Sequence, residues 1–159
     1  RLQVERDNII YTNICDLEAE VTSRSVDDCI EIDVRSSLKA VDQTVPAAGA
    51  VTCSIQYRFS KQTVEITMTL MGSEACDDLE FILPVISENT EKALRVSPDV
   101  YEVAKPDSTV RIKANVPVDV VECGMDRVFN FVPGFETVPL KLAWDTHQVQ
   151  ELHIIISVE

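Results

Sequence analysis

The chain has 159 residues, with 14 Lys and Arg against 27 Asp and Glu, and so a formal net charge of −13. This acidity excludes a nucleic-acid-binding surface, which needs clustered basic residues to displace the counterions of the phosphates. It also disfavours anionic membranes and strongly anionic polysaccharides as ligands of this chain alone. Every apolar run is much shorter than the roughly 18 residues that cross a membrane, so we expect no membrane span.

The length fits a single domain, and we expect residues 1–159 to form one. The sequence begins at Arg1 rather than at a Met and shows no signal peptide. We therefore expect this domain to be a mature product or a piece excised from a larger protein. Such a piece would carry only part of a functional site.

Alternation of apolar and polar residues with period two dominates the chain and predicts β-strands. In chain order, the expected strands cover 8–14, 17–22, 30–35, 51–59, 64–70, 79–86, 110–116, 118–122, 128–132, 138–144 and 152–158. The polar residues 60–62 between two long arms predict a hairpin, and Pro84 predicts an edge strand or a bulge. The best helical segment, Glu88 to Leu94, provides one or two turns at most.

Turns rich in Pro, Gly, Asp and Ser separate these strands, and the sequence contains no internal repeat or low-complexity tract. The sequence therefore predicts an all-β fold, an antiparallel β-sandwich of two packed sheets with about ten to twelve strands and little helix.

The cysteines indicate no known motif. They are odd in number and too widely spaced for a C-x-x-C pair, which argues against a zinc site, a redox site and a disulfide framework. They are Cys15, Cys29, Cys53, Cys76 and Cys123. The sequence still allows one or two disulfide bonds. The doublets Asp27-Asp28 and Asp77-Asp78 lack the spacing of a calcium loop, so we expect neither a metal nor another cofactor.

The sequence contains no recognisable catalytic motif, and the candidate ligand-binding residues are few. Asp145 and His147 share one strand face if the strand continues, while His153 lies further along the chain. Trp144 is the only Trp, and Phe135 belongs to the segment 127–140, which holds three of the five phenylalanines. The candidate ligand-binding residues are therefore Trp144, Asp145, His147 and Phe135. We favour structural roles for them, because the chain lacks a nucleophile motif and has few aromatic residues for a sugar-binding platform.

The strand pattern resembles a known group of domains. Cys29-Ile30-Glu31-Ile32, Ser54 to Phe59 and Val64 to Leu70 resemble the broad supersandwich domains of β-galactosidase-like hydrolases and of heparinase II/III-type polysaccharide lyases. The resemblance covers about a quarter of the chain and consists of pattern rather than signature residues. It implies an accessory domain packed beside a catalytic one, in a secreted or surface protein. The cysteine usage, by contrast, suggests a cytosolic or bacterial context, so a cytoplasmic location stays open.

Three functions follow from these observations. The first is a non-catalytic module of a larger protein, associated with carbohydrate binding or processing and packed on a neighbouring domain. The second is an interaction or assembly domain that binds a protein partner through an acidic face or a sheet edge. The third is a small enzyme that uses Asp145 and His147, and we expect it least because the chain alone lacks a catalytic constellation.

Overall fold

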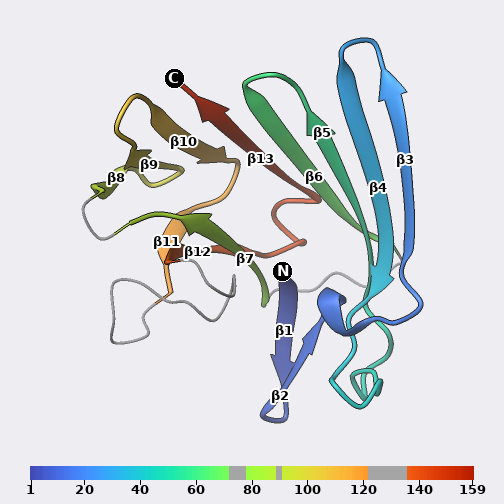
Figure 1. Ribbon diagram of the computed structural model, residues 1–159. Helices are drawn as coiled ribbons and strands as arrows, with labels where there is room; N and C mark the ends of the chain where they lie inside the picture. Colours follow the sequence, from blue (N-terminus) through green and yellow to red (C-terminus); the bar gives the residue numbers. More distant parts are fainter. Residues whose placement is uncertain (72–77, 89–90, 122–135) are drawn as a thin grey trace.

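The computed structural model describes residues 1–71, 78–88, 91–121 and 136–159. Within these ranges, thirteen strands form two antiparallel sheets, which confirms the predicted β-sandwich (Figure 1). The described helical structure is one 3-10 turn, η1 (Asn13–Cys15). The short helix expected over Glu88–Leu94 was wrong, because Ala93 and Leu94 already belong to a strand. The strand that begins at Ala93 is largely exposed and does not alternate regularly, so the period-two pattern did not reveal it.

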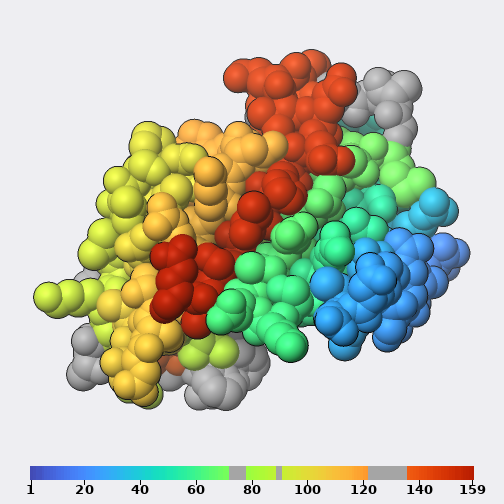
Figure 2. All heavy atoms as spheres, turned by 90° about the horizontal axis from the view of Figure 1, so that it is seen from above, coloured from blue at the N-terminus to red at the C-terminus, as the bar shows by residue number. Residues whose placement is uncertain are grey.

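The larger sheet has eight strands, and in Figure 2 they cross one face from blue through green to the red C-terminal strand and then to orange and yellow. In sheet order the strands are β3 (Glu20–Val26), β4 (Cys29–Ser37), β5 (Thr52–Phe59), β6 (Thr63–Met71), β13 (Glu151–Val158), β10 (Thr109–Ala114), β9 (Val100–Ala104) and β8 (Ala93–Ser97). The predicted hairpin over residues 60–62 is β5–β6, closed by the Ser60 N–H donating to the Thr63 carbonyl at 2.9 Å.

The smaller sheet has five strands that come from both ends and the middle of the chain. In sheet order they are β11 (Val118–Val120), β12 (Thr137–Trp144), β7 (Leu79–Ile86), β1 (Leu2–Arg6) and β2 (Ile9–Thr12). Asp7 and Asn8 form the two-residue β1–β2 turn with φ of 53° and 63°. Asp and Asn tolerate this left-handed conformation and are therefore typical of such hairpins.

The proline in β7 sits where the sheet can accept it. β7 lies between β12 and β1, but β1 covers only the first half of it. Ile82 directs its N–H and carbonyl to Arg1, so Pro84, two residues later, points its missing N–H to the same, uncovered side. Pro84 therefore removes no hydrogen bond from the β7–β12 ladder.

The inward-facing side chains of both sheets form one core. The largest fully buried ones include Ile55, Met68 and Ile112 from the eight-stranded sheet and Leu140 and Trp144 from the five-stranded sheet. In β5, β6 and β10 they alternate with polar residues, as two-faced sheets require, whereas β7 and β13 each carry three apolar residues in succession. The core thus explains the period-two pattern of the sequence.

A polar junction joins the two sheets at the η1 crossover. The Asp16 carboxylate is 5% exposed and accepts hydrogen bonds from the Ser37 N–H at 2.7 Å and the Glu18 N–H at 3.1 Å. Lys39 Nζ lies 2.8 Å from Asp16 Oδ1 and 2.9 Å from Glu18 Oε2. Burial alone would raise the pKa of Asp16, but the bonds from Lys39, Ser37 and Glu18 lower it below its usual value.

Three cysteines fall in the described residues, and all are free thiols: Cys15, Cys29 and Cys53. Burial raises the pKa of the Cys53 thiol, which lies in the core. Cys76 and Cys123 lie outside the described residues.

Candidate functional site

The predicted residue Trp144 ends β12 and is fully buried. Its Nε1 donates a hydrogen bond of 2.6 Å to the Val149 carbonyl, on the far side of the turn that leads to β13. The indole ring packs in the core cluster with Leu79 and Leu152. Because stacking on a sugar needs an accessible ring face, the geometry assigns Trp144 to the packing of this end of the sandwich.

Asp145 and His147 lie directly after Trp144, so three of the four predicted residues come together in one turn. Asp145 Oδ1 accepts from the backbone N–H of His147 at 2.9 Å, and Oδ2 accepts from Gln148 Nε2 at 2.7 Å. The exposed His147 thus contacts the carboxylate through its backbone rather than through its imidazole. This arrangement is an Asx turn, which organises the backbone.

The turn supports a direct prediction. Replacing Asp145 by Ala removes both hydrogen bonds, and we expect urea unfolding to show a loss of about 1 kcal/mol. His147→Ala is the matched control and should change stability by less than about 0.5 kcal/mol, because its exposed side chain leaves the turn intact. Equal losses in the two variants would mean that the imidazole takes part in the turn.

The remaining predicted residue, Phe135, lies outside the described residues. His153, the second histidine, lies in β13, and its backbone N–H donates to Asn115 Oδ1 at 2.8 Å. The doublet Asp27-Asp28 forms the β3–β4 turn, with Asp27 at a φ of 53°. Across the described ranges, no group of three His, Cys, Asp or Glu side chains is arranged to hold a metal. No described helix is long and apolar enough to span a membrane.

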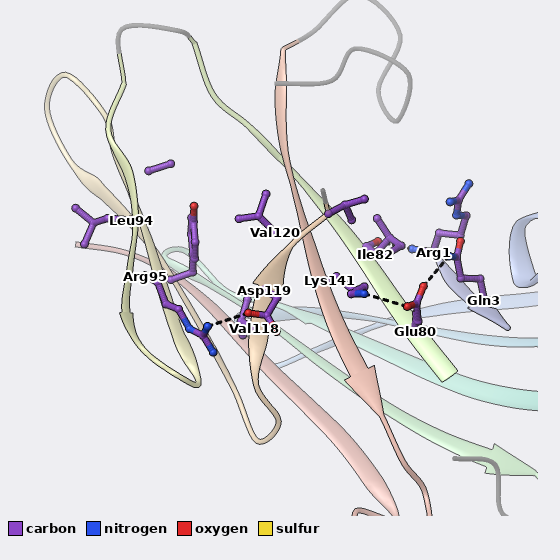
Figure 3. A pocket seen from close by; sticks show the side chains of 13 residues that line it. Arg1, Gln3, Glu80, Ile82, Leu94, Arg95, Val118, Asp119, Val120 and Lys141 are labelled. Atoms are coloured by element: carbon purple, nitrogen blue, oxygen red, sulfur yellow. Dashed lines mark hydrogen bonds and ion pairs between the residues drawn. The ribbon is translucent and has the colours of Figure 1, made fainter. Parts of the chain in front are cut away.

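A cleft of about 740 Å³ opens between the edge strands β8 and β11 and continues over β12, β7 and β1 (Figure 3). Arg95 on β8 and Asp119 on β11 form its first pair, with Arg95 Nη1 2.8 Å from Asp119 Oδ1. This pair bridges the two sheets at their edge. We call this space the polar cleft.

A second set of polar side chains crosses the other end of the polar cleft. Lys141 Nζ lies 3.3 Å from Glu80 Oε1, and Gln3 Nε2 donates to Glu80 Oε2 at 3.0 Å. Each comes from a different strand, β12, β7 and β1, so the pleat places them on the outer face of the five-stranded sheet. Sequence reasoning missed all of them, because single charged residues scattered along the chain give no spacing signal.

The eight-stranded sheet extends beyond the cover of the smaller sheet and leaves apolar residues exposed. One row of its inner face runs across neighbouring strands from the fully buried Ile112 through Ile156, Val64 and Phe59 to Ile30. Exposure rises along it to 36% at Phe59 and 53% at Ile30.

The next row of the same face adds Ile32 and Tyr57, and the Tyr57 and Phe59 rings stack with their centroids 6.3 Å apart. We define the open apolar strip by the uncovered members of both rows, which share one face of the sheet: Ile30, Ile32, Tyr57, Phe59, Val64 and Ile156.

The sequence matches known proteins over its whole length. The profile of the ulvan lyase C-terminal domain family matches residues 1–159. The chain belongs to this family. It is also similar to a broad-specificity ulvan lyase from Formosa agariphila, with 30% identity over 158 residues that cover 99% of this chain and 24% of that lyase. The chain therefore spans about a quarter of the length of this relative.

As an ulvan lyase C-terminal domain, the chain is an accessory domain of the carbohydrate-active enzyme type, which confirms the coarse resemblance drawn from its strand pattern. The family also confirms the association with carbohydrate processing. Among the described residues of this ulvan lyase C-terminal domain, the polar cleft and the open apolar strip are two surfaces that lie outside the buried core.

Proposed function

We propose that the chain acts as a C-terminal accessory domain in a lyase that degrades ulvan, and that it docks on the rest of that lyase through the open apolar strip. The observation that carries this proposal is the match to the ulvan lyase C-terminal domain family over residues 1–159. The relative from Formosa agariphila, named as a broad-specificity ulvan lyase, supports the same substrate. The role proposed is structural, with the cleavage chemistry supplied elsewhere in the lyase.

The open apolar strip supports docking on a large partner. The row runs from the buried Ile112 to the exposed Ile30, so part of its apolar surface is accessible to solvent. Exposed apolar surface of this kind is typical of interfaces. The remainder of a lyase, about three quarters of the relative's length, is a partner of sufficient size. We expect the rest of the lyase to present an apolar patch that packs against Ile30 and Phe59.

The charge distribution around the strip suggests what borders this patch. Asp27 and Asp28 form the β3–β4 turn immediately before Ile30. We therefore propose that basic side chains of the partner surround its apolar patch, since complementary charges orient an interface. That the domain resembles the sandwich domains of heparinase II/III-type lyases in particular is also part of this proposal.

Substitutions in the open apolar strip test the docking. In the longest polypeptide that carries this chain, we expect Ile30→Ser with Phe59→Ser to weaken docking by about 2 to 4 kcal/mol. The interface then no longer buries the apolar surface of these two side chains. Calorimetry should then resolve a separate unfolding transition for the domain, and ulvan cleavage should fall. In the 159-residue chain alone the melting temperature should fall by only about 5 °C, since Ile30 is exposed and Phe59 loses its stacking on the Tyr57 ring.

Ile10→Ser is the matched control, because Ile10 is 49% exposed, close to the 53% of Ile30, and lies on the other sheet. We expect it to leave cleavage and the calorimetric profile unchanged. Unaltered calorimetry and cleavage in the double variant would contradict docking through the strip.

A further inference from the structure

We propose that the polar cleft is a binding site for a short, hydroxyl-rich oligosaccharide, separate from the docking surface. This inference deepens the proposed role in ulvan degradation and rests on it. Its basis is a set of hydrogen-bonding side chains that converge on one hollow from five strands of both sheets, β8, β11, β12, β7 and β1.

The geometry of the polar cleft is suited to sugar hydroxyls. The Arg95–Asp119 pair lies on one side, and the Lys141–Glu80–Gln3 chain lies on the other (Figure 3). Each group is held by a neighbour, so donors and acceptors are oriented before a ligand arrives. A sugar ring offers adjacent hydroxyls that both donate and accept, which allows it to bond a cation and its paired carboxylate together.

One acceptor in the wall of the cleft is unsatisfied. Gln3 Nε2 donates to Glu80, whereas Gln3 Oε1 is buried and accepts no hydrogen bond from the described residues. Buried acceptors without a donor are uncommon. Gln3 lines the cleft, so this oxygen is an acceptor to which a ligand hydroxyl could donate, beside the cation of Lys141.

The charge of the polar cleft differs from that of the chain. Its lining carries the cations Arg1, Arg95 and Lys141 against the acids Glu80 and Asp119, whereas the chain has a net charge of −13. The general argument against binding polysaccharide through an acidic surface therefore does not apply at this place. A sugar with or without an acidic group meets a locally balanced surface here.

The volume of the cleft is extended by a neighbouring cavity. A second cavity of about 580 Å³ shares Ala93, Leu94, Tyr101 and Val120 with it and extends toward Glu91. The two cavities adjoin at these shared residues, of which Leu94 and Val120 are apolar. Ligand sites of several hundred Å³ that combine apolar walls with a few polar groups are the usual form of small-molecule pockets.

Titration of the isotope-labelled chain, followed by nuclear magnetic resonance, tests the site. The probes are ulvan tetrasaccharides and, as a second arm, cellotetraose. We expect saturable shifts at residues 80–82, 94–95, 118–120 and 141 with at least one probe, and a Kd on the order of 1 mM or tighter. Absence of saturation with both probes at about 10 mM, or shifts confined to other surfaces, would overturn the proposal.

Variants then locate the contact. Arg95→Gln with Lys141→Gln should weaken binding at least about tenfold. Both residues form exposed ion pairs, so the double variant should fold with an unchanged amide spectrum away from the cleft. The matched control is Arg58→Gln, which also removes an exposed cation but from the outer face of the eight-stranded sheet. Equal Kd values for the double variant and the control would refute the site, whereas the docking proposal depends only on the longer lyase and the open apolar strip.

Discussion

Replacing Trp144 by Ala should destabilise the domain by about 3 to 5 kcal/mol, the largest effect that we expect from any single substitution. The ring is fully buried, so its removal leaves a cavity lined by core side chains of both sheets. It also leaves the Val149 carbonyl without its 2.6 Å hydrogen bond. For a domain of this length, such a loss corresponds to a fall of roughly 8 to 15 °C in melting temperature.

Trp144→Phe separates the two contributions. It keeps an aromatic ring in the core but loses the indole N–H, so we expect a smaller loss of about 1 to 2 kcal/mol. Far-ultraviolet circular dichroism during thermal unfolding is the measurement, because both variants lack the only Trp and with it the fluorescence signal. A melting temperature of Trp144→Ala near that of the wild type would contradict the packing role. Tight oligosaccharide binding that disappears in Trp144→Phe would instead indicate a direct contact with a ligand.

The sequence predicted the strands whose alternation is long and regular. β5 and β6, β10 and β13 all lie within or close to their expected ranges, because each presents one face to the core and the other to water. The pattern of two-faced strands also carried the resemblance to accessory domains of carbohydrate-active enzymes.

The pairing of the strands was beyond such reasoning. Alternation shows which face of a strand is buried but not which strand lies beside it, and β13 pairs with β6 and β10 across long stretches of chain. The short strands β1, β8 and β9 were not expected. β8 lies at an edge, is largely exposed and has a register shift between Arg95 and Ser97, so its residues are not selected for a regular pattern.

The candidate sites illustrate the same limit. Trp144, Asp145 and His147 are adjacent in sequence, and their closeness in the turn could be predicted. The polar cleft brings together Gln3, Glu80, Arg95, Asp119 and Lys141, which only the sheet order makes neighbours. The open apolar strip had been visible only as ordinary core-facing positions, because sequence alone does not show where one sheet ends above the other.

Asp16→Asn should be the second most damaging change, with a loss of about 2 to 4 kcal/mol at neutral pH. The buried carboxylate accepts two backbone N–H groups and pairs with Lys39, so the crossover between the sheets depends on a negative oxygen at this place. An amide has the same shape but directs an N–H at one of these donors and leaves the half-buried Lys39 ammonium less well compensated.

The pH dependence of this loss identifies its cause. The folded state lowers the pKa of Asp16, so the unfolded chain takes up the proton first as the pH falls. The stabilisation is therefore complete above the unfolded pKa of about 3.9 and is lost as the pH falls through the lower folded value. Urea titrations of the wild type and Asp16→Asn should differ most at neutral pH and converge below about pH 4.

Asp42→Asn is the control for this experiment. The Asp42 carboxylate also has a lowered pKa, through its bonds to Thr44, but it is exposed and does not join the sheets. We expect its loss of stability to be clearly smaller than that of Asp16→Asn. A difference between the wild type and Asp16→Asn that stays constant from neutral pH to acid would show that shape, and not the charge of Asp16, holds the crossover. Convergence in acid would instead show that the ion pair of Asp16 and Lys39 helps to hold the two sheets in their relative position. The polar cleft depends on that position, because residues of both sheets line it.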